Sequence, residues 1–232
     1  MIVALKSDLL SLNPRAHRAR DWPPSRLDEI SADMVRRYYD KPLNPGWVNP
    51  FRNQGFVRDA TIPHADGSHT AIADLPAFLR ALLVTDGTVT KILEAYFWEP
   101  VEVRTLRQTF IHAEKPVEWI RVGADDQVLI RRAHLRGTDT GRIYADAFSV
   151  IRTHLIPETF RRRLVDREIG IGVLIRDSGL ESYREVLEFG VEPAPADGAD
   201  SGERVFRSYR IIIEGEPVIL ITESFPLDLY AG

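Results

Sequence analysis

The strongest chemical signal in this chain is a single carboxylate inside an apolar segment, residues 217–225. Glu223 follows Ile221 by two residues and Ile219 by four. Because the side chains of a β-strand alternate between its two faces, all three point to the same side. A carboxylate on a buried face costs free energy unless a cation or a hydrogen bond stabilises it, and functional sites often hold such groups. Glu223 is therefore a candidate catalytic residue.

The segment 128–135 shows the same pattern with the opposite charge, because Arg131 shares its strand face with Ala133 and Leu135. One interpretation is a buried structural salt bridge between Arg131 and Glu223. The other is a ligand site, in which the guanidinium binds a carboxylate through two parallel hydrogen bonds and the glutamate acts as an acid, a base or an orienting group. Strand spacing leaves both open. An inward arginine and an inward glutamate together suggest a pocket for a small, charged organic ligand.

A helical hairpin is predicted upstream of these strands. Asp74 is a candidate N-cap for a first helix that runs to Leu83. Residues 85–87, which end in glycine, interrupt the pattern, and Thr88 can cap a second helix.

Strand patterns dominate the rest of the chain and are joined mostly by short turns. Apolar alternation predicts strands over residues 101–110, 127–136, 142–154, 181–192, 204–213 and 217–225. Residues 117–122 also show a strand pattern, and helices are predicted over 157–166 and 170–179. Because hairpins rather than alternating helices connect the strands, we expect an α+β fold on a six-stranded antiparallel sheet. The helices should lie on one side, with helical hairpin flaps over an internal ligand pocket.

Residues 1–66 differ from the remainder, which we take as the main domain, residues 67–232. They are rich in proline and contain one helical pattern, residues 25–39. Trp47, Phe51 and Phe56 lie among proline, asparagine and glycine. We expect an irregular extension whose aromatic side chains pack on the main domain; a lid over the pocket is the alternative.

Composition excludes several classes of function. The chain has 232 residues, a net charge of −4 and no cysteine, which excludes thiol catalysis and thiolate metal sites. Acidic and basic residues are interspersed, so no nucleic-acid surface is expected. The apolar start of the chain is too short to span a membrane, and we expect a cytoplasmic protein without a membrane contact. The sequence predicts no oligomeric state.

No cofactor and no metal are expected either. The sequence has no phosphate-binding loop, no complete dinucleotide fingerprint and no nucleophile elbow. Residues 64–69 contain two histidines and an aspartate, but this composition is more typical of a polar turn than of a metal site.

Four segments in order, residues 82–91, 128–132, 171–175 and 220–223, resemble the chorismate pyruvate-lyase family. That family makes 4-hydroxybenzoate, and its fold is similar to the effector-binding domain of GntR-type repressors. The resemblance implies elimination of pyruvate from chorismate without a metal or redox cofactor. The expected partner is a small aromatic or cyclohexadienyl carboxylate.

The resemblance also implies roles for individual residues. Arg131 should bind a ligand carboxylate, and Glu223 should contact the ring hydroxyl region. The backbone amides of Val89 and Ile171 should hold carboxylate oxygens. Thr222, inside the last matching segment, is expected to contact the substrate.

Several alternatives remain open at this point. The family has Pro-Leu-Gly where this chain has residues 170–172, so Ile169 competes with Ile171 for the second amide position. Arg132 competes with Arg131 but lies on the wrong strand face. The extension and the altered flap leave room for a divergent lyase on another chorismate-derived acid. The shared fold leaves room for a sensor or binding domain that holds an aromatic acid without converting it.

Overall fold

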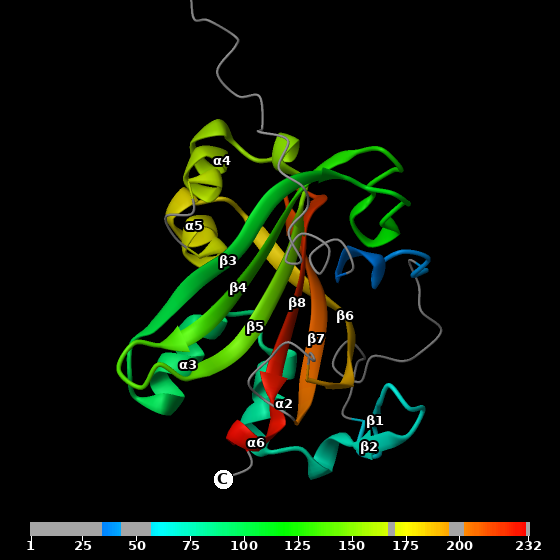
Figure 1. Ribbon diagram of the computed structural model, residues 1–232, viewed down its shortest axis with the longest axis vertical. Helices are drawn as coiled ribbons and strands as arrows, with labels where there is room; N and C mark the ends of the chain where they lie inside the picture. Colours follow the sequence, from blue (N-terminus) through cyan, green and yellow to red (C-terminus); the bar gives the residue numbers. More distant parts are fainter. Residues whose placement is uncertain (1–33, 43–56, 167–169, 195–201, 231–232) are drawn as a thin grey trace, which may run out of the picture.

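A single antiparallel sheet of six strands organises the computed structural model, which describes residues 34–42, 57–166, 170–194 and 202–230 (Figure 1). The spatial order is β3-β4-β5-β8-β7-β6, so two three-stranded meanders meet where β5 pairs with β8. The strands are β3 (Val101–His112), β4 (Gln127–Gly137), β5 (Ile143–Ile151), β6 (Ser182–Pro193), β7 (Glu203–Ile213) and β8 (Glu216–Pro226). The predicted α+β class and six-stranded sheet are confirmed.

The last hairpin shows how local sequence sets the register that matters for the site. Glu214 and Gly215 connect β7 to β8, both with positive φ angles of 51° and 82°. Two such residues form the turn whose twist matches antiparallel strands. Every residue of β8 after Glu216 is buried, as expected for a central strand covered on both faces. Glu223 therefore sits in one of the most enclosed strands of the molecule.

Helices α2 to α6 cover one face of the sheet. Figure 1 shows α4 and α5 toward one end of the strands and α2, α3 and α6 toward the other. Their bounds are α2 (Ala77–Val84), α3 (Val89–Phe97), α4 (Glu158–Val165), α5 (Ile171–Ser178) and α6 (Leu227–Tyr230). The helical hairpin is thus present, with Thr88 at the N-cap of α3. Its first helix begins after Pro76 instead of at Asp74, which belongs to a short 3-10 helix, η1 (Ile72–Asp74).

The opposite face of the sheet is covered by residues from two other parts of the chain. Val35 and Tyr38, from the short helical stretch near residue 35, pack with Trp119 and Ile120 against this face. The strand predicted at 117–122 is wrong. Trp119 and Ile120 lie in a 3-10 helix, η2 (Glu118–Ile120), and Arg121 reverses the chain with a φ angle of 52°. Consecutive residues in a tight helical turn can both reach the core, which a strand does not permit.

A small hairpin of β1 (Thr61–Pro63) and β2 (His69–Ala71) lies at the β6 edge, where His64 bridges Val191. The expected boundary at residue 66 falls in the turn of this hairpin, and the division into an extension and a main domain stays a prediction. Trp47, Phe51 and Phe56 lie outside the described residues. Within the part of the chain that the structure describes, no helix is long and apolar enough to cross a membrane.

Candidate functional site

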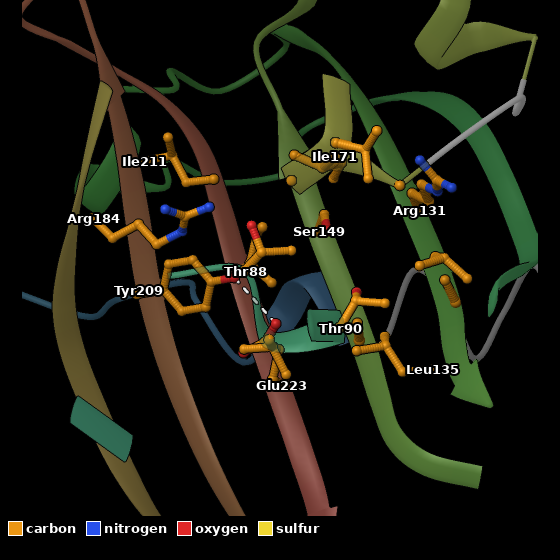
Figure 2. Close-up of a pocket in the computed structure, with 18 of the residues that line it drawn as sticks. Thr88, Thr90, Arg131, Leu135, Ser149, Ile171, Arg184, Tyr209, Ile211 and Glu223 are labelled. Atoms are coloured by element: carbon orange, nitrogen blue, oxygen red, sulfur yellow. Dashed lines mark hydrogen bonds between the residues drawn. The ribbon is translucent and has the colours of Figure 1, made fainter. Parts of the chain in front are cut away.

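A pocket lies between the helix-covered face of the sheet and the first turns of α3 and α5 (Figure 2). Its floor comes from β4, β5, β8 and β7, and its roof from residues 87–90 and 170–173. The residues that form the floor are Arg131, Ala133, Leu135, Ala147, Ser149, Tyr209, Ile211, Ile221 and Glu223. The pocket thus uses strands from both meanders.

Strand pairing explains why this part of the sheet is hollow. Arg131 pairs with Ser149 across β4 and β5, and Ala147 pairs with Glu223 across β5 and β8. Directly opposed residues of an antiparallel pair share a face. On β5, which lies between the strands of the two charged residues, the floor therefore carries only the small side chains of Ala147 and Ser149. These short side chains leave space above the sheet, and the two charges border it.

Glu223 is hydrogen-bonded by two buried side chains of the neighbouring strand β7. The Nε atom of Arg207 donates to Glu223 Oε2 at 3.0 Å, and Arg207 Nη2 lies 2.9 Å from the same oxygen. The Tyr209 hydroxyl donates to Oε1 at 3.2 Å. Burial raises the pKa of Tyr209, and the negative charge of Glu223 raises it further. Tyr209 therefore stays protonated and keeps its role as a hydrogen-bond donor to the carboxylate.

Arg207 also connects the site to the helical hairpin above it. Its side chain is fully buried, and its Nη1 atom donates to the carbonyl oxygens of Leu82 at 2.5 Å and Thr85 at 2.7 Å. Both carbonyls belong to the C-terminal end of α2 and the turn that follows. One guanidinium thus fixes the position of Glu223 relative to the turn that leads into α3.

Arg131 lies on the far side of the hollow from this network and is 2% exposed. Its Nη2 atom donates to the Thr105 hydroxyl of β3 at 2.8 Å. The sequence left open a direct salt bridge between Arg131 and Glu223. The structure gives Glu223 a different cation, Arg207, and places the hollow between Glu223 and Arg131.

Two helix N-termini form the roof. Val89 and Ile171 are the first residues of α3 and α5, and both line the pocket. The first N–H groups of an α-helix have no acceptor within the helix, and this end carries a partial positive charge. The two roof segments also lie close together. A Cβ atom built on the backbone of Gly172 would be in van der Waals contact with Thr88 Cγ2, at 3.4 Å. Amides of the kind expected to hold carboxylate oxygens are therefore at the pocket; Ile169 lies outside the described residues.

Thr222 does not line the pocket, and the geometry gives no support to its predicted contact with the substrate, which stays a prediction. Its hydroxyl lies 2.6 Å from the Tyr38 hydroxyl and 2.6 Å from the Ser208 hydroxyl, on the opposite face of the sheet. Neighbouring residues of a strand point to opposite faces, so Thr222 cannot share the face of Glu223. Arg132 lies on that opposite face for the same reason, and it forms an ion pair with Asp146 at 3.0 Å.

Three site residues escaped the sequence analysis: Arg207, Tyr209 and Arg184. The first two share a face of β7 with Val205, Ile211 and Ile213, which is the same signal that identified Arg131 and Glu223. Arg184 comes from β6, lines the pocket and donates to the carbonyl oxygen of Asp86. No comparable pattern marks it, because charged residues occur on both faces of β6.

The electrostatic balance of the pocket favours an anion. Arg207 compensates the one carboxylate, Glu223, while Arg131, Arg184 and two helix N-termini add positive charge. Among the described residues, no group of three or more histidines and acidic residues could hold a metal ion.

Comparisons with known proteins match this chain to one family. The family described as "Chorismate pyruvate-lyase Rv2949c-like" matches residues 83–231, a stretch that includes both roof segments, Arg131 and Glu223. The chorismate pyruvate-lyase of Mycobacterium leprae is 30% identical over 167 residues, which cover 68% of this chain and 78% of that protein. The chorismate pyruvate-lyase of Mycobacterium tuberculosis is 28% identical over 168 residues, which cover 68% of this chain and 84% of that protein.

The solved structures that resemble this one include a transcriptional regulator of the GntR family from Enterococcus faecalis. Its TM-score is 0.39 at 14% identity, and the match covers 54% of this chain and 93% of that chain. The family match, which spans most of this chain, decides the assignment. The chain belongs to the Rv2949c-like chorismate pyruvate-lyase family.

Proposed function

We propose that this protein is a lyase that eliminates pyruvate from chorismate and releases 4-hydroxybenzoate. The observation that carries the proposal is the placement of Arg131 and Glu223 on two sides of one hollow, each with its own partner. A guanidinium held in this way can bind the ring carboxylate. The carboxylate of Glu223, already fixed by Arg207 and Tyr209, can accept a hydrogen bond from the ring hydroxyl.

The substrate has the matching polarity. In chorismate the ring carboxylate and the ring hydroxyl lie at opposite ends of a six-membered ring. Arg131 and the amides of Val89 and Ile171 would hold the first, and Glu223 the second. Because both ends are held, the ring is fixed in one orientation in the pocket. Positioning of this kind can lower a reaction barrier by roughly 7–11 kcal/mol at best.

The reaction requires one bond cleavage and one hydrogen transfer. The bond between the ring carbon and the ether oxygen breaks, and the hydrogen on the hydroxyl-bearing carbon leaves the ring, which becomes aromatic. That hydrogen reaches the methylene carbon of the enolpyruvyl group, which departs as pyruvate. Aromatisation makes the reaction strongly favourable, so the protein has mainly to hold a reactive pose.

We assign Glu223 an orienting role in this step. A carboxylate can accept about four hydrogen bonds, so the donors from Arg207 and Tyr209 leave capacity for the substrate hydroxyl. Holding this hydroxyl fixes the direction of the neighbouring carbon–hydrogen bond relative to the enolpyruvyl group. The hydrogen can then pass within the substrate without a protein base.

The test is direct. The purified protein is incubated with chorismate, pyruvate is measured with a coupled lactate dehydrogenase assay, and 4-hydroxybenzoate by chromatography. We expect the two products in equal amounts. Chorismate that binds without forming either product would refute the lyase and favour a binding domain. Pyruvate accompanied by a different aromatic acid would keep the lyase and refute the assigned product.

Arg131→Ala tests the site. Loss of a hydrogen-bonded charge should raise the KM for chorismate and the Kd for 4-hydroxybenzoate about 10-fold to 100-fold. Arg136→Ala is the matched control, because Arg136 lies on the same strand, pairs with Glu102 and does not line the pocket. Equal effects of the two substitutions would refute the assignment of Arg131.

A further inference from the structure

Arg184 stands out among the pocket residues because the reaction described above gives it no role. It lies on β6, the edge strand at the opposite side of the sheet from β3, and its side chain reaches over Tyr209 toward the pocket (Figure 2). Arg131 lies on β4, near the other edge. Four strand spacings of about 4.8 Å separate β4 from β6, so the two backbones lie roughly 19 Å apart along the sheet. The pocket therefore has a guanidinium at each side, with the hollow between them.

The side chain of Arg184, and not its strand register, brings its guanidinium toward the Glu223 network, because it donates to the carbonyl oxygen of Asp86, the residue after Thr85, whose carbonyl Arg207 contacts. Arg184 pairs with Ile211, and Tyr209 is the next residue of β7 on that face. The positive charge of Arg184 is close enough to Tyr209 to oppose the rise in the pKa of its hydroxyl, and this hydroxyl donates to Glu223. A ligand whose hydroxyl meets Glu223 therefore has Arg184 beside that end of its ring.

The orientation of Arg184 is fixed from the roof. One of its terminal nitrogens donates to the carbonyl oxygen of Asp86, in the turn between α2 and α3. A guanidinium has five N–H donors in a planar fork, so a single contact leaves donors for a carboxylate. The contact with Asp86 holds the side chain over the pocket and lowers the entropy cost of binding an anion there.

We infer that Arg184 binds a second carboxylate of the substrate, so that the pocket selects a dicarboxylate over a monocarboxylate. This inference rests on the proposed function and adds a residue to it. In chorismate the carbon that bears the enolpyruvyl ether is next to the carbon that bears the hydroxyl. The enolpyruvyl carboxylate therefore lies toward the hydroxyl end of the ring, where Glu223 and Arg184 are. Arg131 binds the ring carboxylate at the other end.

This arrangement has a consequence for product release. Once the ether bond breaks, the two carboxylates belong to different molecules, and neither product can bridge Arg131 and Arg184. Each product is then held by one guanidinium only. The substrate is bound by both, so the pocket discriminates against its own products.

The experiment compares two ligands in one variant. Arg184→Ala should raise the KM for chorismate about 10-fold to 100-fold, while the calorimetric Kd for 4-hydroxybenzoate stays within about twofold of wild type. Arg184→Lys should recover part of the lost affinity, because it keeps the charge but not the planar fork. Arg176→Ala is the control, since Arg176 is exposed on α5 and pairs with Asp177 outside the pocket.

Each other outcome overturns the inference. If Arg184→Ala weakens chorismate and 4-hydroxybenzoate equally, Arg184 only supports the turn at Asp86. If it weakens neither, the second carboxylate binds elsewhere. Failure of the proposed function is distinguishable, because the wild-type protein would then form no pyruvate. In that case the Kd values of chorismate and 4-hydroxybenzoate, measured in wild type and Arg184→Ala, still show whether Arg184 binds a second carboxylate, independently of any reaction.

Discussion

Substitution of Glu223 by glutamine should cost the protein stability as well as activity, because the carboxylate is the counterion of a fully buried arginine. Arg207 is 0% exposed and its guanidinium lies 2.9–3.0 Å from Glu223 Oε2. Glutamine has nearly the same shape but no charge. The change therefore leaves a buried guanidinium without its anion, and breaking a buried pair in this way costs about 3–5 kcal/mol.

The size of this loss makes it easy to measure. For a chain of this length, 1 kcal/mol shifts the melting temperature by about 2–4 °C, so Glu223→Gln should melt about 6–20 °C below wild type. Urea unfolding gives the free energy directly. The carbonyl contacts of Arg207 with Leu82 and Thr85 persist in this variant, so the native fold should form. Turnover should fall, because the group that we propose to hold the ring hydroxyl has changed.

A double-mutant cycle isolates the pair. Arg207→Met and the double variant, combined with Glu223→Gln, give the coupling free energy between the two side chains. The control is Glu185→Gln, which breaks the less buried pair of Glu185 with Arg210 and should cost no more than about 1 kcal/mol. If Glu223→Gln unfolds within about 1 kcal/mol of wild type, Arg207 does not depend on Glu223 and the electrostatic account of the site is refuted.

Two further predictions concern groups outside the pocket. The hydroxyl of Tyr144, helped by the backbone amide of Thr140, lowers the pKa of Glu99 to about 2. Because the unfolded value is about 4.3, this stabilisation is complete above that pH and is lost as the pH falls toward 2. Urea titrations from pH 6 to pH 2.5 should therefore show a steeper loss of unfolding free energy for wild type than for Glu99→Gln, and parallel curves would contradict this. Thr222→Val removes a buried hydroxyl from the far face of the sheet and should cost about 1–3 kcal/mol of stability while the KM for chorismate stays unchanged; a raised KM at unchanged stability would return Thr222 to the site.

The period of two along a strand was enough to place Arg131 and Glu223 on one face and at one pocket. It also excluded Arg132, which the structure pairs with Asp146 on the other face. The same rule separates Thr222 from Glu223, yet Thr222 entered the expected site because it lies inside a segment that resembles a family motif. Proximity in sequence within a strand is therefore weak evidence for a shared site.

Other parts of the site depend on pairing that no single segment reveals. The partner of Glu223 is Arg207, directly opposite on β7, and only the register of β7 with β8 identifies it. The place of Arg184 in the pocket is still harder to predict from the sequence, because the register of β6 with β7 shifts between Val186 and Glu188. A one-residue shift changes which side chains share a face, so periodicity alone does not determine where β6 contributes.

The meeting of the two meanders at β5 and β8 makes the pocket a junction. Arg131 and Ser149 come from the meander that precedes this junction, and Glu223, Tyr209 and Arg184 from the meander that follows it. Neither half of the sheet contributes all the charged residues of the pocket. A ligand that contacts both Arg131 and Glu223 would connect the two meanders across the β5–β8 pairing. At a concentration of 100 times its Kd it would add about 2.7 kcal/mol to the free energy of unfolding.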